Sequence, residues 1–306
     1  MPRICYDKLT LARLKKSDRM TVIDQANAII AEYLAQGFQL TLRQLYYQFV
    51  SRDLIPNKQT EYKRLGDIIV DGRMAGLIDW NAIVDRTRNL ESLAHWDDPA
   101  GIVTAVSEQF RVDKWARQPN RVEVWIEKDA LIGVIEGVCN DLDVPYFSCR
   151  GYTSISEVWS AGQRLKGYRK AGQVPIVLHF GDHDPSGIDM TRDITDRLSL
   201  FMGGRMEIRR LALNMDQVTQ YDPPPNPAKM SDSRAEGYVQ LYGDESWELD
   251  ALEPAVLAAL IRDEIASLQE ATAWEEAEEE EREGRRQLTE IAERYEDVTK
   301  FLEEDQ

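Results

Sequence analysis

The sequence predicts an α/β protein: a helical N-terminal domain, then a domain with a mainly parallel sheet, then an acidic helical tail. Three observations predict this arrangement. Apolar residues recur at helical spacing through the first third of the chain, β-rich apolar runs alternate with helical segments from residue 120 onward, and the C-terminal end is acidic and helix-forming. We expect a first domain at residues 1–90, a connecting segment at 91–120, a second domain at 121–265 and the tail at 266–306.

The composition suits a globular protein whose charge is unevenly distributed. Of the 306 residues, 43% are hydrophobic and 8% aromatic, which is enough to fill a core. The net charge is −17, but residues 263–306 hold 17 acidic and 5 basic side chains, whereas residues 1–90 hold 14 basic and 10 acidic ones. The acidity is therefore mainly a property of the tail, and the basic first third is compatible with phosphate contacts.

Hydropathy and cysteine usage argue against several classes of protein. No apolar run approaches the roughly 20 residues needed to cross a bilayer, and the first ten residues are too polar for a secretory signal. We therefore expect a cytoplasmic protein without a membrane partner. Cys5, Cys139 and Cys149 are odd in number and never spaced as CxxC, so the sequence predicts neither a disulfide framework nor a zinc site.

Three helices are predicted in the first domain. The first covers residues 20–33 and ends before Gly37; the second is capped by Thr41 and ends near residues 54–57; the third runs over residues 59–75. Short helices with tight connections resemble a helix-turn-helix of the winged type, which binds DNA. A small helical bundle of another kind is the alternative.

Strands and helices alternate in the second domain, which predicts right-handed βαβ units and a parallel sheet covered on both faces. The expected strands are 122–126, 144–147, 175–180 and 206–213, and the expected helices are 130–138, 155–168 and 188–200. The connecting segment has some helix near residues 100–110. Residues 221–233, rich in proline, are expected to form an extended surface loop, and a helix opens at Pro254. From residue 270 onward we expect a solvated or partly disordered tail.

Carboxylates follow two of the predicted strands at their carboxyl ends. Glu127 comes directly after one apolar strand, and Asp182 and Asp184 follow another. Functional groups of parallel sheets collect at this edge, and Mg²⁺ is held by a few carboxylates while it keeps several waters. The sequence therefore predicts a magnesium site at Glu127, Asp182 and Asp184. The alternative is that the two aspartates are turn or capping residues; His179 and His183 are expected to be structural.

Arg43 and Tyr47 lie four residues apart on the second predicted helix and so share a face, whereas Tyr46 points elsewhere. A tyrosine has a pKa near 10, so only about one molecule in a thousand is phenolate at pH 7, and a nearby cation helps it attack phosphorus. Tyr47 is therefore a candidate nucleophile. The alternative is that both tyrosines are packing residues with Arg43 extended over them.

These motifs resemble a known family. Glu127 together with the run from Gly181 to Gly187 is similar to the Toprim domain shared by topoisomerases, bacterial primases and several nucleases. The run Arg43-Gln44-Leu45-Tyr46-Tyr47 resembles the active-site motif of the A subunit of topoisomerase VI and of its meiotic double-strand-break relatives. Gly151-Tyr152 and the run from Trp247 to Leu252 are also similar, and the likeness covers roughly residues 20–265.

The resemblance implies a topoisomerase-like, magnesium-dependent enzyme that cleaves double-stranded DNA by tyrosine transesterification. It implies a winged-helix domain at residues 1–90, a Toprim domain at 121–265, and a homodimer in which Tyr47 of one subunit approaches the metal site of the other. Tyr47 would be the nucleophile, Arg43 its electrostatic helper, and Glu127, Asp182 and Asp184 the metal ligands; Lys128 is a candidate phosphate contact. Because nothing in the chain resembles an ATPase, strand passage would require a separate ATPase subunit.

Two other functions remain open on the sequence. The first is a hydrolytic Toprim nuclease, which uses the same carboxylates but not Tyr47. The second is a non-catalytic DNA-binding module that keeps only the fold. Primase activity is disfavoured because the cysteines that would bind zinc are missing.

Overall fold

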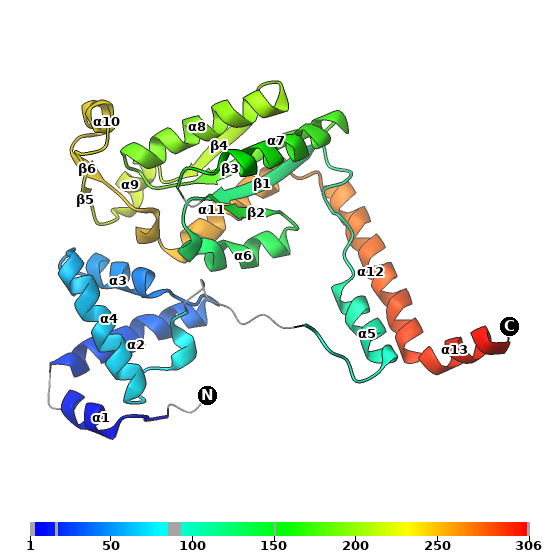
Figure 1. Cartoon of the computed structure of the whole chain (residues 1–306), viewed down its shortest axis with the longest axis horizontal. Helices are drawn as coiled ribbons and strands as arrows, with labels where there is room; N and C mark the ends of the chain where they lie inside the picture. The colour runs from blue at the N-terminus through cyan, green and yellow to red at the C-terminus, as the bar shows by residue number, and fades with distance from the viewer. Residues whose placement is uncertain (1–3, 16–17, 85–92, 150, 305–306) are drawn as a thin grey trace.

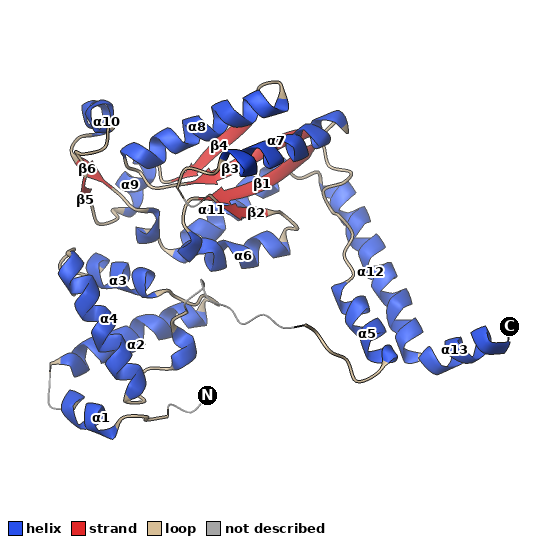
Figure 2. Cartoon of the chain, in the orientation of Figure 1, coloured by secondary structure: helices blue, strands red, loops and turns tan. Residues whose placement is uncertain are grey.

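The computed structural model describes residues 4–15, 18–84, 93–149 and 151–304 and shows an α/β protein with one four-stranded sheet (Figures 1 and 2). A helical N-terminal domain precedes the sheet. The long helix α12 (Ala271–Glu293) projects away from the sheet and lies beside the shorter α5 (Pro99–Gln109) (Figure 1). None of the helices in these ranges is both long and apolar enough to span a membrane.

The N-terminal domain confirms the three predicted helices and adds one before them. Its helices are α1 (Lys8–Leu14), α2 (Arg19–Ala35), α3 (Leu42–Ser51) and α4 (Gln59–Met74), followed by the 3-10 turn η1 (Trp80–Ala82). A capping box starts α3, because the Thr41 backbone N–H donates to Gln44 Oε1 at 2.8 Å and the Gln44 N–H donates to Thr41 Oγ1 at 3.3 Å. Asp7 caps α1, a polar start that the periodicity of apolar residues did not indicate.

The β-structure of this domain is limited to one bridge. Between residues 4 and 84, the described part of the chain forms a single parallel pair, Leu40 with Ile83, and no strand hairpin of the kind that a wing requires. The helices therefore have the expected order, whereas the winged type stays a prediction. Their shared core, which includes Tyr33, Phe49, Leu65 and Ile68, is buried from solvent.

The sheet is parallel throughout and has the order β2-β1-β3-β4. Its strands are β1 (Asn120–Ile126), β2 (Tyr146–Ser148), β3 (Val174–Phe180) and β4 (Glu207–Ala212), close to the predicted ranges. Ile126 pairs with Phe180 at the carboxyl ends of β1 and β3. This register places the residues that follow these two strands next to each other.

Helices cover both faces of the sheet, as parallel strands require. The 3-10 turn η2 (Asp129–Leu131) leads into α6 (Ile132–Asp141), which packs with α11 (Pro254–Leu268) on one face; α7 (Ile155–Lys170) and α8 (Pro185–Met202) pack on the other. Side chains of β1 alternate between the two faces of the sheet. Val124 and Ile126 pack in the core with α6 and α11, and Trp125 packs in the core with α7 and α8.

The segment between β4 and α11 is more ordered than the sequence predicts. It contains α9 (Met215–Tyr221), β5 (Asn226–Pro227), α10 (Ala235–Tyr242), β6 (Glu245–Ser246) and the 3-10 turn η3 (Leu249–Ala251). The expectation of a wholly extended loop at residues 221–233 is therefore wrong in part, because β5 pairs antiparallel with β6 and Ala228 is buried. The prolines exclude helix here but not a short pairing of this kind.

The C-terminal helices form an arm with the connecting segment. In Figure 1, α12 (Ala271–Glu293) runs beside α5 (Pro99–Gln109), and α13 (Tyr295–Glu304) follows it. Glu281 on α12 is buried. Its carboxylate accepts from the Val112 N–H, just after α5, at 3.1 Å and from Arg285 on α12 at 2.6 Å. The expectation of a solvated or partly disordered tail is therefore wrong for α12 as regards disorder, since α12 is a docked helix, although most of its acidic side chains are exposed.

Candidate active site

Glu127 and Asp182, two of the three predicted metal ligands, lie next to each other at the carboxyl edge of the sheet. The Glu127 N–H donates to the carbonyl of Phe180 at 2.8 Å and so extends the β1–β3 ladder by one residue. One carboxylate oxygen of Glu127, Oε2, then accepts from the backbone N–H of Asp182 at 2.9 Å. Residues 55 positions apart are brought together because β1 and β3 are neighbours in register.

The Asp182 side chain is buried, and both of its carboxylate oxygens have partners. Its Oδ1 accepts from the Leu249 N–H at 2.7 Å, and its Oδ2 lies 2.9 Å from Lys128 Nζ. Burial raises the pKa of Asp182 to about 7, and the Glu127 carboxylate adds to this shift while Lys128 opposes it. Burial also raises the pKa of Glu127, and nearby Asp184 adds to the rise. Burial is thus the main reason that both carboxyl groups hold their protons more tightly than usual.

Asp184 caps α8, which is the role that the alternative interpretation assigned to it. Its Oδ1 accepts from the Gly187 N–H at 2.6 Å and from the Ser186 hydroxyl at 2.9 Å. This geometry does not exclude metal binding, because the second oxygen of Asp184 has no hydrogen-bond partner among the described residues. The same holds for Oε1 of Glu127.

The described carboxylates of this edge do not form a closed metal cage. Within the ranges that the structure describes, no group of three or more histidine, cysteine, aspartate or glutamate side chains is arranged to hold a metal. Mg²⁺ is commonly bound through one or two carboxylates, with waters and substrate phosphates completing its shell. Among the described residues, Oε1 of Glu127 and the second oxygen of Asp184 are the carboxylate oxygens of this edge that could take part in such a shell.

A network of ion pairs connects this edge of the sheet to the N-terminal domain. Lys128 Nζ lies 2.9 Å from Asp182, 2.7 Å from Glu248 and 3.0 Å from Asp250. Arg43 on α3 pairs with the same Glu248 oxygen, and its Nε lies 3.0 Å from Asp250 Oδ2. Burial alone would lower the pKa of Lys128, but the three carboxylates raise it above its ordinary value, so the ammonium stays charged.

Tyr47 is 4% exposed and lies beside this network. The guanidinium carbon of Arg43 is 5.9 Å from the centroid of the Tyr47 ring, which agrees with their spacing on one helix face. Burial raises the pKa of Tyr47 well above its usual value, Glu248 raises it further, and Arg43 opposes both effects. The phenol is therefore neutral in this conformation. Contrary to expectation, Tyr46 does not point away: its ring packs edge-on against that of Tyr47, with the centroids 5.4 Å apart, and its hydroxyl lies 3.0 Å from Asn57 Oδ1.

A small pocket opens next to Tyr47. Its volume is about 170 Å³, and its lining combines two cations with three phenols: Arg43, Tyr46, Tyr47, Asn57, Lys58, Gln59, Tyr62, Asn226 and Glu248. Both domains contribute to the pocket, since Asn226 and Glu248 belong to the sheet domain. Tyr47 and Asp182 are thus linked through Arg43, Glu248 and Lys128 of one and the same chain. The resemblance, in contrast, implies that Tyr47 approaches the metal site of the partner subunit.

Arg210 on β4 holds the loop that carries the two aspartates. Its buried guanidinium donates to the carbonyls of Gly181 at 3.0 Å, Asp182 at 2.6 Å and Gly187 at 3.0 Å. Burial lowers the pKa of Arg210 to about 10, which leaves it charged at neutral pH. No sequence motif marked Arg210 as a site residue, although an arginine within a predicted buried strand is a signal that could have found it.

The two histidines of this region are structural in their contacts, as expected. Nδ1 of His183 lies 2.7 Å from the Tyr238 hydroxyl, and the His183 backbone pairs with Trp247 at 2.8 and 2.9 Å. Burial lowers the pKa of His183 to about 4 and that of His179 to about 3. Both rings are therefore neutral near pH 7, and the bridge to Trp247 holds the segment with Glu248 and Asp250 beside the aspartates.

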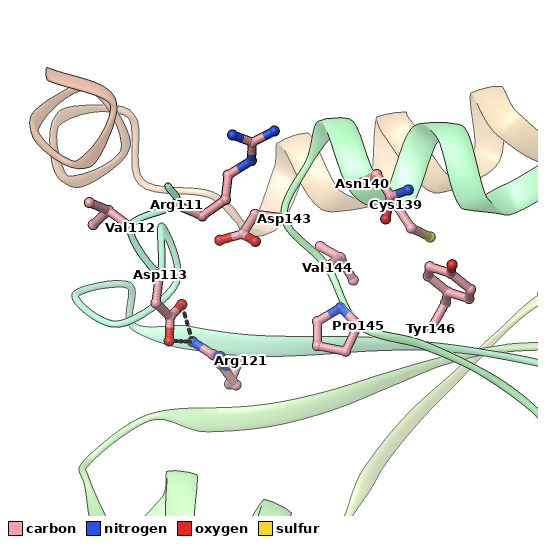
Figure 3. A pocket seen from close by; sticks show the side chains of 10 residues that line it. All are labelled: Arg111, Val112, Asp113, Arg121, Cys139, Asn140, Asp143, Val144, Pro145 and Tyr146. Atoms are coloured by element: carbon pink, nitrogen blue, oxygen red, sulfur yellow. Dashed lines mark hydrogen bonds and ion pairs between the residues drawn. The ribbon is translucent and has the colours of Figure 1, made fainter. Parts of the chain in front are cut away.

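A larger hollow of about 770 Å³ lies at the opposite end of the sheet (Figure 3). It is lined by Arg111, Val112, Asp113, Arg121, Cys139, Asn140, Asp143, Val144, Pro145 and Tyr146, and contains none of the predicted site residues. Arg121 is already paired with Asp113 at 2.6 and 2.8 Å, as Figure 3 shows. Because parallel sheets carry their chemistry at the carboxyl ends of strands, size alone does not make this hollow the functional site.

Comparison with known proteins adds no assignment. No family model matches this chain, and no curated protein matches it. The likeness to the Toprim domain and to the topoisomerase VI A subunit therefore depends on the motif residues and on their placement.

Proposed function

We propose that this chain is a magnesium-dependent enzyme that cleaves double-stranded DNA by tyrosine transesterification, similar to a type IIB topoisomerase A subunit. Tyr47 is the nucleophile, Arg43 its helper, and Glu127, Asp182 and Asp184 are the metal ligands. The observation that carries the proposal is that the loop with Asp182 contacts Glu127 at the sheet edge, while Lys128 links that edge to Arg43 beside Tyr47.

The finer fold and the partners belong to the same proposal. Helices α2 to α4 form the winged-helix-like DNA-binding domain, and strands β1 to β4 with their helices form the Toprim domain. The parallel order β2-β1-β3-β4 with carboxylates after β1 and β3 supports the second assignment. The enzyme acts as a homodimer, and strand passage requires a separate ATPase subunit.

The reaction exchanges one phosphoester bond for another. The Tyr47 oxygen gives up its proton, attacks phosphorus and forms a phosphotyrosine bond, while the bond from phosphorus to a deoxyribose oxygen breaks and that oxygen takes up a proton. Arg43 stabilises negative charge on the phenol oxygen, and Lys128 binds a phosphate oxygen. Glu127, Asp182 and Asp184 would hold a magnesium ion, which would supply positive charge next to the phosphate.

Trapping a covalent adduct tests this function. Supercoiled DNA incubated with the protein and Mg²⁺, then denatured, is expected to carry protein attached to its cut ends. Tyr47→Phe is expected to abolish the adduct, because it removes the attacking oxygen and leaves the ring in place. Tyr221→Phe is the matched control, since Tyr221 is exposed and outside the pocket. Equal adduct yield from the Tyr47 variant would contradict the assignment.

A hydrolytic nuclease is the second candidate, and one observation favours it. Tyr47 is 4% exposed and its pKa is raised by burial, which makes the phenol a poor nucleophile in this conformation. Water activated at the carboxylates would then cut the DNA. Nicking that survives Tyr47→Phe but is lost in Glu127→Ala would establish this function in place of transesterification.

A further inference from the structure

We propose that Arg43 and Lys128 form a binding subsite for a DNA backbone phosphate, and that the Glu248 carboxylate fills this subsite until DNA displaces it. The inference rests on the proposed function, since it names how the DNA is recognised at that site. It assigns Glu248 the role of an internal substitute for phosphate.

The position of Glu248 suits this role. Its Oε2 contacts both cations, Lys128 Nζ at 2.7 Å and the Arg43 guanidinium, so a single anionic oxygen bridges two positive groups that come from different domains. Glu248 and Arg43 also line the pocket that contains Tyr47. A phosphodiester carries the same charge as a carboxylate and offers oxygens for the same donors, so phosphate bound between these cations would lie within reach of the phenol.

Two acidic residues contact the cations, but they differ in burial. Asp250 is 0% exposed and lies 3.0 Å from both Arg43 Nε and Lys128 Nζ. Glu248 is 27% exposed and faces the pocket. The buried carboxylate can therefore keep both cations in place when the exposed one leaves. This division of roles makes Glu248 the exchangeable member of the network.

Tyr47 lies beside the subsite in a shielded position, since burial is the main cause of its raised pKa. With Glu248 in the subsite, its negative charge raises the pKa of the phenol and offsets the help of Arg43. When phosphate replaces it, Arg43 remains near the ring and Glu248 moves toward solvent.

The test measures binding without cleavage. In a Tyr47→Phe background, the affinity for a fluorescein-labelled DNA duplex is measured for Glu248→Gln and for Glu245→Gln, a control on β6 that removes the same charge from an exposed position nearby. Removing a competitor from a partly exposed pair is expected to tighten binding about threefold, and the control is expected to change it by much less. Asp250→Asn is expected to weaken binding, because it releases both cations.

Unchanged or weaker binding by Glu248→Gln would overturn the proposal, because a purely structural bridge predicts that result together with a lower melting temperature. The absence of duplex binding in all variants would overturn it as well. Failure of the proposed function is seen separately, in the adduct assay on the unmodified chain. Tighter binding without an adduct would therefore keep the phosphate subsite and reject transesterification.

Discussion

Lys128 balances the charge of the site. It follows Glu127 directly, and its ammonium lies within 3.0 Å of Asp182, Glu248 and Asp250. Removing one partner of a buried ion pair leaves the other charge buried without compensation, so the loss of Lys128 is expected to be strongly destabilising. The residue that the sequence marked only as a candidate phosphate contact is thus also a structural requirement.

Replacing Lys128 by Met should therefore destabilise the chain. We expect the free energy of unfolding to fall by about 3 kcal/mol, since Asp250 and Asp182 then lie buried with less compensation. Urea unfolding followed by tryptophan fluorescence measures it. Lys170→Met, at an exposed position on α7, is the control and should stay within about 0.5 kcal/mol of the parent. A comparable loss in both variants would argue against the network.

At the level of elements, the turn from β3 into α8 brings the site together. Gly187 is required there by space: a Cβ at this position would lie 2.2 Å from the carbonyl oxygen of Asp182. The close approach lets Asp184 cap the helix while Arg210 holds the carbonyls of the same loop. Glycine at the start of α8 is thus explained by the site and not by helix formation.

Gly187→Ala is expected to disrupt this turn. The clash is with backbone, which cannot move aside as a side chain can, so we expect a loss of about 1–3 kcal/mol and a large loss of DNA cleavage. The comparison is Gly137→Ala on α6, where a Cβ meets nothing within 4 Å and alanine should stabilise the helix by up to about 1 kcal/mol. Thermal unfolding measures the stability of both variants. Equal stability of Gly187→Ala and Gly137→Ala would refute the steric argument.

The elements themselves were largely predictable. Period and capping signals located α2, α3, α4 and the four strands of the sheet, because each has a long apolar pattern of its own. Short elements such as α1, α9 and β5 were missed since their few residues gain stability mainly from contacts with distant parts of the chain. Asp7, which caps α1, is an example of a local signal without an apolar repeat to support it.

For the whole molecule, the arm of α5 and α12 shows how distant segments are joined. Glu281 on α12 is buried and accepts from the Val112 N–H, just after α5, and from Arg285 on its own helix. The run of glutamates around it is exposed. Glu281 therefore has a packing role that the acidic composition of the tail could not reveal.

Glu281→Ala should loosen the arm without unfolding the sheet. Loss of these hydrogen bonds is expected to cost about 1–3 kcal/mol locally, since a buried N–H and an arginine lose their acceptor. Hydrogen exchange should become faster in residues 99–112 and 271–293 and stay unchanged in β1 and β3. Glu279→Ala, which removes only an exposed pair with Arg282, should leave exchange as it is. Faster exchange throughout the chain would count against a separate role for the arm.

The sequence by itself determined the α/β class, the order of the main elements and the candidates Arg43, Tyr47, Glu127, Asp182 and Asp184, because these depend on local periodicity and on residue type. Only the tertiary structure decided that Asp184 caps a helix, that Arg210 supports the loop, and that Glu248 and Asp250 join Arg43 to Lys128. The physical reason is that ion pairs and caps depend on which distant side chains the strand register and helix packing bring within about 3 Å. No local pattern encodes that distance.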